Sequence, residues 1–513
     1  MNAFVGALIL CLPAAPFLLL CFRRGFIRRA CMFRRAFLIL VGGLAGYVSL
    51  VVVMAWLFPH LLLWLIAFAA PPVFYLLYWR AQPRFGTDRG LPPGSLQLAP
   101  SGPWRDYLFY LKQAERFGPV FKMNNFIQPM ICLQGIKRGN DFLKQHEQST
   151  VTPPMPFNSH VPRGFMRYMA PDLNLEYRNR MKPIFSDRRF LDRKADSIEQ
   201  SIRTYLVASG VNPVLALENM TFAALADLFF GVSTHDPEFG RLSQLYREID
   251  YRHSFLASWS GTERRLEEIE RIFLARVNTL PSYFRDFLRP SASDQRSWAL
   301  DKTLVRNFIY LLQTSWIDVS DLLLWILKYL SEHPRWMETL QTHLRAAERS
   351  GLQFAQDLAR RVVLETLRLE QSEYIMRKAL HDLHFEGFLI PKGWLVRIGV
   401  RESHRDGAIY DDPHSFNPDR FLANPYRIRQ YSPFGLQQKS CLGKRLTLVM
   451  AERFVLALAR DYRCTVMQDG PRELGAFHWR PSSKWRVKIL PCSTAGNLCD
   501  VGPSQHTQLS LSS

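Results

Sequence analysis

One stretch constrains the chain more than any other, the run from Ser432 to Glu452 that reads SPFGLQQKSCLGKRLTLVMAE. Within it, Cys441 lies in a glycine-bearing loop and directly precedes a run with the apolar spacing of a helix. The positive end of a helix dipole stabilises a thiolate, the form of cysteine that binds metals. Phe434, Gly435 and Gly443 let this loop pass close to something large and flat. The loop is therefore a candidate ligand site, and a buried free cysteine is the plainer alternative.

Three further motifs surround this loop in a fixed order. The run ETLRLEQSEYIMR places Glu365 and Arg368 three residues apart, on one face of a helix. After it come GFLIPKGWLV and SHRD, and then FNPDRF, which supplies Arg420. A glutamate and an arginine at this spacing are usually a surface pair, so the motif alone has little specificity. Its position in this order gives it weight.

With these motifs in order, the chain resembles the cytochrome P-450 family over roughly residues 90 to 492. Phe434, Cys441 and Gly443 match the spacing of the family's haem-binding signature, F-x-x-G-x-R-x-C-x-G. The match has two departures, because Gln437 stands where the signature has glycine and Lys439 where it has arginine.

The resemblance implies haem b as cofactor, with Cys441 as the axial thiolate and metal ligand and with Phe434 and Gly443 beside the haem. A thiolate ligand pushes electron density onto the iron and favours O–O cleavage. The resemblance also implies that a buried network holds the cysteine loop; its members here are Glu365, Arg368 and Arg420.

The resemblance further implies basic residues that bind the haem propionates. Arg178, in EYRNRMKPIFS, occupies the arginine place of a W-x-x-x-R motif, and Asn174 stands in place of the tryptophan. A guanidinium can bind a carboxylate in a fork. Arg377 is the second candidate and Lys439 the third, although a lysine lacks the fork geometry. A solvated basic helix is the alternative for the Arg178 segment.

Apolar periodicity predicts a long helix over residues 302 to 333. In the family, such a helix carries A/G-G-x-D/E-T-T/S, whose acid and alcohol steer protons during dioxygen activation. Here the corresponding stretch is Thr314 to Ser320, which has no glycine and no acid followed by an alcohol. Asp318 is the main catalytic candidate because a carboxylate in an apolar helix is exposed, paired or chemically used. Thr314 and Ser320 are weaker candidates, since hydroxyls on helices usually bond back to a carbonyl.

The first 89 residues predict a membrane anchor of two or three transmembrane helices. Ala36 to Phe58 is an uncharged run long enough to span a bilayer, which takes about 20 residues, and residues 3–22 and 60–79 are further candidates. Six arginines lie between the first two runs, so the positive-inside rule puts that loop and the large remainder of this multi-pass protein on the cytoplasmic side. A cleaved signal peptide is the alternative for residues 3–22.

The expected architecture is mainly α with small β-sheets, a cytochrome P-450 fold preceded by N-terminal transmembrane helices. We assign residues 1–89 to the anchor, 90–492 to a haem domain and 493–513 to a disordered polar tail. The net charge of +20 does not indicate nucleic acid, because the basic residues are scattered and form no recognition motif. Eight cysteines without a CxxC pair favour a reducing compartment over a disulfide framework or a zinc site.

The resemblance to the cytochrome P-450 family implies a monooxygenase that inserts one oxygen atom from dioxygen into a lipophilic small molecule. Protons would arrive through Asp318 or ordered water. No flavin or ferredoxin domain is present in the sequence, so electrons would come from a separate partner, an NADPH reductase or a ferredoxin. Lys439, Lys444 and Arg445 are candidates for docking it, and a solvated charge cluster is the alternative. The missing acid–alcohol pair keeps open a peroxygenase or an isomerase or dehydratase of peroxides. A non-catalytic haem-binding protein is a third alternative.

Overall fold

The structure is a computed structural model, and most of its described residues lie between 90 and 492. The described ranges are 46, 49, 90–96, 102–125, 128–154, 156–186, 194–206, 212–249, 261–277, 301–346, 349–370, 374–423, 426, 430–474 and 479–492. This part of the chain is mainly helical, with one six-stranded sheet and three two-stranded sheets. The expected fold class, mainly α with small sheets, is confirmed.

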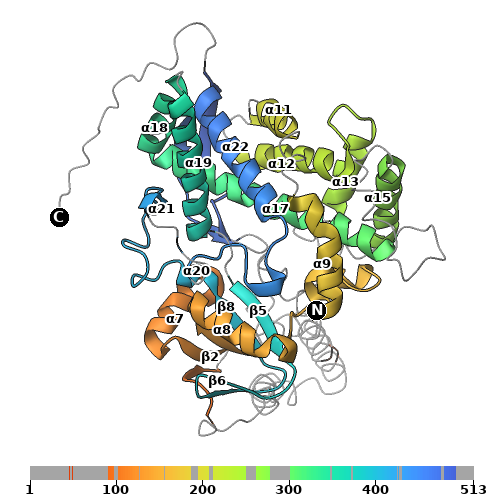
Figure 1. Ribbon diagram of the computed structural model, residues 1–513, viewed down its shortest axis with the longest axis vertical. Helices are drawn as coiled ribbons and strands as arrows, with labels where there is room; N and C mark the ends of the chain where they lie inside the picture. The colour runs from red at the N-terminus through yellow and green to blue at the C-terminus, as the bar shows by residue number, and fades with distance from the viewer. Residues whose placement is uncertain are drawn as a thin grey trace, which may run out of the picture.

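Helix α17 (Lys302–Glu332) is the longest helix in the described ranges and crosses the helical part of the molecule (Figure 1). Its N-terminus is capped by Asp301, whose side chain accepts a hydrogen bond from the Leu304 amide at 3.2 Å. It ends just before His333 and Pro334, and the proline opens the next helix instead. The predicted helix over 302–333 is thus confirmed to within one residue.

Other helices pack around α17 and build most of the core (Figure 1). Helix α12 (Pro213–Phe230) is an example: most of its apolar residues are buried, and Gly231 ends it in the left-handed conformation that favours glycine. The longer helices of this part are α9 (Pro171–Ser186), α11 (Ala195–Leu206), α12 (Pro213–Phe230), α13 (Glu238–Glu248), α15 (Thr262–Arg276), α18 (Pro334–Arg345), α19 (Arg349–Glu370) and α22 (Lys444–Asp461).

A six-stranded sheet forms the second part, with α7 (Phe109–Phe117) and α8 (Ile136–His146) beside it (Figure 1). Its order is β1-β2-β3-β8-β5-β4, with parallel pairing in β1·β2 and β3·β8 and antiparallel pairing elsewhere. The strands are β1 (Gly94–Ser95), β2 (Val120–Asn125), β3 (Gln128–Gln134), β4 (Thr150–Val151), β5 (Tyr374–Ala379) and β8 (Leu395–Gly399).

Three two-stranded sheets and several short helices complete the described fold. The pairs are β6 (Leu383–Phe385) with β7 (Phe388–Ile390), β9 (Tyr462–Gln468) with β12 (Arg486–Pro491), and β10 (Glu473–Leu474) with β11 (Trp479–Arg480). The short helices are α6 (Gly102–Arg105), η2 (Glu147–Ser149), η3 (Pro156–His160), η4 (Met166–Tyr168), α20 (Val400–Ser403), α21 (Arg420–Ala423) and η8 (Gln437–Lys439).

The cysteine loop lies at the border between the helical core and the sheet core. Phe434 packs against the hydrophobic cluster of the helices, whereas Leu436 belongs to the cluster of the sheet. Two residues apart in one short loop, they fasten it to both parts of the molecule. The position of Cys441 is therefore set by the relative placement of the helices and the sheet.

Of the helices in the described ranges, only α12 is long and apolar enough to cross a membrane, and 78% of its apolar window is buried inside the protein. Burial of that extent marks α12 as a core helix. The predicted transmembrane runs 3–22, 36–58 and 60–79 and the predicted tail 493–513 lie outside the described residues.

Candidate functional site

The structure brings Glu365, Arg368 and Arg420 together in a fully buried ion network. Arg368 donates from Nε and Nη2 to the two oxygens of Glu365 at 2.7 and 2.8 Å, in a fork. Arg420 donates from Nε to Glu365 Oε1 at 3.3 Å, and the Asn417 amide donates to the same oxygen at 3.0 Å. Glu365 and Arg368 have no solvent-accessible surface. A buried pair of this kind costs desolvation, which the additional hydrogen bonds offset.

His404, from the SHRD motif, connects this network to the cysteine loop. Arg368 Nη1 donates to the His404 carbonyl at 2.6 Å, and His404 Nε2 accepts from the Ser432 amide at 3.0 Å. Burial and the neighbouring Arg368 and Arg405 lower the pKa of His404 to about 3, so its ring is neutral and can act as this acceptor. Tyr431 adds a second link by donating to the Leu364 carbonyl at 2.8 Å. The start of the loop is thus bonded to the network through fixed hydrogen bonds.

The backbone of the cysteine loop is held in a tight turn. The Cys441 amide donates to the Phe434 carbonyl at 2.7 Å, and Gly435 has a φ of 83°. Gln437, which replaces the glycine of the family signature, also has a positive φ, 56°. Side chains other than glycine pay about 1–2 kcal/mol in this region, so the loop keeps the conformation that favours glycine despite the substitution. The Gln437 side chain donates to Asn140 Oδ1 of α8.

The Cys441 thiol lies in a protein-lined space and not on the outer surface. Cys441 keeps solvent-accessible surface, yet desolvation by surrounding protein raises the pKa of its thiol. A sulfur that faces an internal space would account for both the accessible surface and the desolvation. The nearby Asp318 carboxylate raises this pKa further, whereas the Gly443 N–H hydrogen bond and the guanidinium groups of Arg178 and Arg167 lower it.

One face of α17 is open toward such a space. In the middle of this helix, which is buried on its other sides, Leu311, Thr314 and Ser315 are half-buried and Asp318 is exposed. Residues spaced at i, i+3, i+4 and i+7 lie on one helical face. The Asp318 carboxylate is close enough to raise the pKa of the Cys441 thiol, and we infer from this that the open face looks toward the thiol.

The other catalytic candidates on α17 differ in position. Thr314 lies on the open face, and its hydroxyl donates back to the carbonyls of Tyr310 and Leu311 at 3.0 and 3.2 Å. Ser320 is buried away from this face and donates to the Trp316 carbonyl at 2.6 Å. The structure therefore brings Asp318 and Thr314 to one face, and it does not bring Ser320 there.

Four basic side chains, Arg167, Arg178, Arg377 and Lys439, are here called the cation cluster. Arg167 and Arg178 act on the Cys441 thiol, and Arg167 and Arg377 act on Lys439. Desolvation lowers the pKa of Arg178, and the Cys441 thiolate opposes this effect. Burial first, and then Arg377 and Arg167, lower the pKa of Lys439 to about 8. Burial and the positive charge of Arg167 also lower the pKa of Arg377. These groups repel one another in a desolvated place.

The described protein does not neutralise the cation cluster. Glu147 is the carboxylate that acts on it, at 3.5 Å from Arg377 Nη2, and the buried Nε of Arg377 has no hydrogen-bond partner among the described residues. Lys439 Nζ reaches only the Thr152 hydroxyl, at 3.4 Å. An anionic group with several oxygens fits this arrangement, and the two propionates of haem b are such groups. The chemistry of the thiol and of the cation cluster thus fits haem b.

Sequence reasoning did not single out Arg167, because it lies in the proline-rich loop 151–175 without a motif around it. Asn174 is buried on α9, and its Nδ2 donates to the Met166 carbonyl at 2.6 Å. In the place of the family's tryptophan, this chain therefore has an amide that holds the loop before α9. The departure from the motif at Asn174, four residues before Arg178, is the sequence signal that could have indicated this contact.

The loop before α9 is also fastened to α17. Arg306 Nη1 donates to the His160 carbonyl at 3.1 Å, and Asn307 Oδ1 accepts from the Met166 amide at 2.6 Å while its Nδ2 donates to the Gly164 carbonyl at 3.3 Å. Arg306 is buried and also pairs with Glu263 of α15 at 2.8 Å. Two adjacent residues of α17 therefore hold this loop at three points.

A thiol on a loop at a helix start, a buried Glu–Arg–Arg network behind it and an unneutralised cation cluster around it define a haem-thiolate protein. The family model for cytochrome P-450 matches residues 299–479. Residues 299–479 thus carry the features of the cytochrome P-450 family, whose members bind haem b through a cysteine thiolate. Relatives named as hydroxylases support a P-450 oxidoreductase of the monooxygenase type.

Curated relatives match most of the chain. Abscisic acid 8'-hydroxylase 3 of Oryza sativa subsp. indica is 27% identical over 456 residues, which cover 79% of this chain and 89% of the relative. Cucurbitadienol 11-hydroxylase of Siraitia grosvenorii is 24% identical, with 78% and 93% covered. These names describe the relatives.

Solved structures share the fold. A cyanobacterial cytochrome P-450 with retinoic acid bound has a TM-score of 0.65 and 25% sequence identity, and the match covers 79% of this chain and 100% of that chain. A zebra fish cytochrome P-450 with abiraterone has a TM-score of 0.62 and 18% identity, with 75% and 100% covered, and it shows the fold alone. Together these matches confirm the predicted cytochrome P-450 fold.

Proposed function

We propose that this chain inserts one oxygen atom from dioxygen into a lipophilic small molecule, with Cys441 as the axial ligand of its haem iron. The observation that carries the proposal is that the Cys441 thiol faces the open side of α17 on which Asp318 lies. When bound, haem with a thiolate ligand supplies O–O cleavage. The residues of the chain bind the cofactor, hold the loop and move protons.

The cation cluster would bind the haem propionates, with Arg377 and Arg178 as the main partners and Lys439 as a third. The unpartnered Nε of Arg377 supports this role, because a propionate would satisfy a donor that is otherwise buried without an acceptor. Phe434 and Gly443 would hold the loop beside the haem. The Phe434 carbonyl accepts a hydrogen bond from the Cys441 amide, and the Gly443 N–H donates one to the Cys441 sulfur. Glu365, Arg368 and Arg420 have a structural role only.

Asp318 would deliver protons from the open face of α17. Its exposed carboxylate can exchange protons with water in the space that it shares with the thiol. Thr314 lies one turn before it and can accept a hydrogen bond while its own hydroxyl is donated to Tyr310. Ser320 remains the weakest of the three candidates, since it is buried away from this face.

A second function, as a peroxygenase or as an isomerase or dehydratase of peroxides, is favoured by one specific observation. The residues that flank Asp318, Ile317 and Val319, are both buried and apolar, so the carboxylate is not followed directly by an alcohol as it is in the family's motif. Reactions that start from a peroxide need no proton delivery to dioxygen. They remain the main competitor of the monooxygenase proposal.

The proposal includes a membrane anchor in residues 1–89, a haem domain in 90–492 on the cytoplasmic side and a polar tail in 493–513. It also includes a separate NADPH reductase or ferredoxin as electron donor. Lys444 and Arg445 are exposed in the first turn of α22, directly after Cys441, and give this side of the molecule a positive surface for an acidic partner.

The first test is the spectrum of the reduced, carbon monoxide-bound protein. We expect a strongly red-shifted Soret band that is lost in Cys441→Ser and kept in Cys464→Ser, a half-buried cysteine on β9 that serves as control. A band like that of a histidine-ligated haem in the wild-type protein would contradict the assignment of Cys441.

The second test separates the two functions. With NADPH and a purified reductase, the proposal predicts dioxygen-dependent product, and abscisic acid, cucurbitadienol and retinoic acid are the first compounds to screen because the names of its relatives mention them. Asp318→Ala should divert electrons to peroxide. Turnover with peroxide alone, and none with reductase and dioxygen, would favour the second function.

A third test reads Asp318 without turnover. In the haem-free protein, Asp318→Asn should lower the pKa of the Cys441 thiol, because it removes a negative charge that raises this pKa. Alkylation of Cys441 by iodoacetamide at pH 8 should then become faster, whereas the exposed control Glu338→Gln on α18 should leave the rate unchanged. An unchanged rate in Asp318→Asn would contradict the proximity of the two groups.

A further inference from the structure

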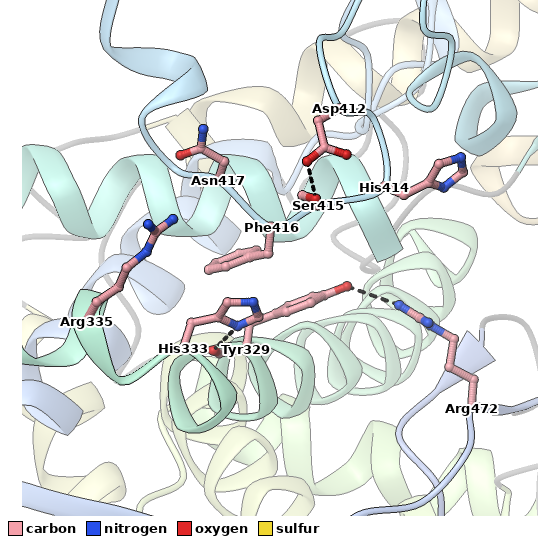
Figure 2. Close-up of a pocket in the computed structure, with 9 residues that line it drawn as sticks. All are labelled: Tyr329, His333, Arg335, Asp412, His414, Ser415, Phe416, Asn417 and Arg472. Carbon is pink, nitrogen blue, oxygen red and sulfur yellow. Dashed lines mark hydrogen bonds between the residues drawn. The ribbon is translucent and has the colours of Figure 1, made fainter. Parts of the chain in front are cut away.

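A second pocket lies where the end of α17 meets the start of α18, and none of its lining residues belongs to the group around Cys441 (Figure 2). It has a volume of about 460 Å³. Four of its lining side chains are basic, and one carboxylate faces them. The basic residues are His333, Arg335, His414 and Arg472, and the acidic residue is Asp412.

The wall behind this pocket carries a further excess of positive charge. Arg472 Nη2 lies 2.6 Å from Glu370 Oε1, and Arg405 Nη2 lies 3.8 Å from the same oxygen. Two guanidinium groups therefore share one carboxylate. The Nε of Arg472 and the Nη1 of Arg405 are buried and have no hydrogen-bond partner among the described residues. Within the described part of the chain, the Oε2 of Glu370 is buried without a donor as well. Of these residues, Arg472 lines the pocket, so an anion bound there would lie beside this guanidinium.

The start of α18 adds to the positive potential of the pocket. This twelve-residue helix begins at Pro334, and His333 at its N-cap makes no side-chain hydrogen bond to the first turn. Pro334 has no N–H and the Trp336 N–H is bonded to the His333 carbonyl, so the contribution of this helix start is its dipole, which favours an anion. Arg335, which is exposed, follows directly in that first turn.

The positive surroundings are visible in His414 itself. Burial first, and then the positive charges of Arg405 and Arg368, lower the pKa of this histidine. Figure 2 shows Arg335 and Arg472 on opposite sides of the stacked rings of Phe416 and Tyr329, whose centroids are 4.4 Å apart. Cationic groups thus stand at both ends of an aromatic wall.

We propose that this pocket binds a small organic oxyanion, a carboxylate or a phosphate ester, between Arg335, His414 and Arg472. Its volume is within the range of about 300–1,000 Å³ that is typical of small-molecule sites, so the anionic group would be part of a molecule larger than a bare ion. Guanidinium groups bind carboxylate and phosphate oxygens in the same fork, so both classes fit the same donors. The site is independent of the reaction proposed for Cys441.

The test uses the full chain in detergent micelles and two probes, inorganic phosphate and succinate, titrated at constant ionic strength against chloride. Calorimetry gives the dissociation constants, and the thermal unfolding midpoint gives a second readout. We expect at least one probe to bind and to raise the midpoint. Binding of one probe and not the other identifies the class of the ligand.

The variant that tests the site is the double substitution Arg335→Gln and His414→Gln, chosen because both side chains are exposed and outside the buried Glu370 network. We expect the dissociation constant to rise at least about tenfold, the effect of losing one charge-assisted hydrogen bond. Arg345→Gln, at the other end of α18, removes a charge outside the pocket and should leave binding unchanged. Failure of both probes to bind, or equal weakening in Arg345→Gln, would overturn the proposal.

Discussion

The network behind the cysteine loop and the cation cluster both contain buried charged side chains, yet their charges are balanced differently. In the network, Glu365 receives two guanidinium groups and a backbone amide. In the cation cluster, Arg377 keeps a buried donor without an acceptor, and repulsion between cations contributes to the lowered pKa of Lys439. The described protein neutralises the first set of charges and leaves the second for a ligand. Charge balance therefore distinguishes scaffold from binding site within one small region.

The largest effect on stability should come from a substitution in the Glu365–Arg368–Arg420 network. Arg368→Ala leaves Glu365 buried without its main partner, and loss of one partner of a buried ion pair costs about 3–5 kcal/mol. We expect the free energy of unfolding to fall by that amount, measured by urea denaturation of the haem-free protein. Lys137→Ala, which removes one partner of an exposed ion pair with Asp141, is the matched control and should cost at most about 1 kcal/mol. Equal losses in both variants would contradict the comparison.

On the unbalanced side, Arg377→Gln should act on haem affinity more than on folding. Removing a buried cation that is only partly paired costs the haem-free protein little. It also removes a charged hydrogen bond to a propionate, worth about 1.5–3 kcal/mol. We expect haem affinity to fall roughly 10- to 100-fold in a transfer assay to apomyoglobin. A large loss of haem-free stability with unchanged haem affinity would show that Arg377 belongs to the scaffold.

Lys439 gives the comparison a pH signature. Its folded-state pKa of about 8 lies below the ordinary lysine value of 10.5, so between these two pH values the unfolded chain holds more protons than the folded one. Stability of the haem-free protein attributable to Lys439 should therefore rise with pH from about 8 to about 10.5 and stay constant below pH 8. The difference between wild type and Lys439→Met, measured by urea denaturation at pH 7.5 and 9.5, isolates this slope. With haem bound, a propionate partner should remove it; a slope that persists would contradict that pairing.

The smallest effect concerns the loop itself. Gln437→Gly relieves a positive φ, but it also removes the hydrogen bond to Asn140 and adds chain entropy to the unfolded state. We expect a net change in unfolding free energy of less than about 1 kcal/mol, against a loss of more than about 1 kcal/mol for Gln437→Val, whose β-branch disfavours this conformation further. Equal stability of the glycine and valine variants would show that the positive φ is not maintained in solution.

Much of this architecture could be predicted from the sequence because it is local. Apolar periodicity locates α17 and α12, and Gly231 marks where α12 ends. Ser320 shows where local reasoning fails: two residues after Asp318, it lies about 200° around the helix and so faces away. The cation cluster shows the other limit. Lys439 and Arg377 are found by motif, but Arg167 joins them only through the path of a loop that periodicity does not describe.

The contacts of Arg306 and Asn307 have a consequence for how fast a ligand can enter. Three hydrogen bonds to side chains of two adjacent residues tie the loop that contains residues 160–166 to α17. Opening of this segment breaks these bonds and also lifts the buried Phe165 and Met166 out of the helical core. The Met166 amide, which donates to Asn307, becomes available for exchange with solvent deuterons only when that contact opens. Its exchange rate therefore reports how often the loop opens, and it can be measured in the resting protein before any substrate is known.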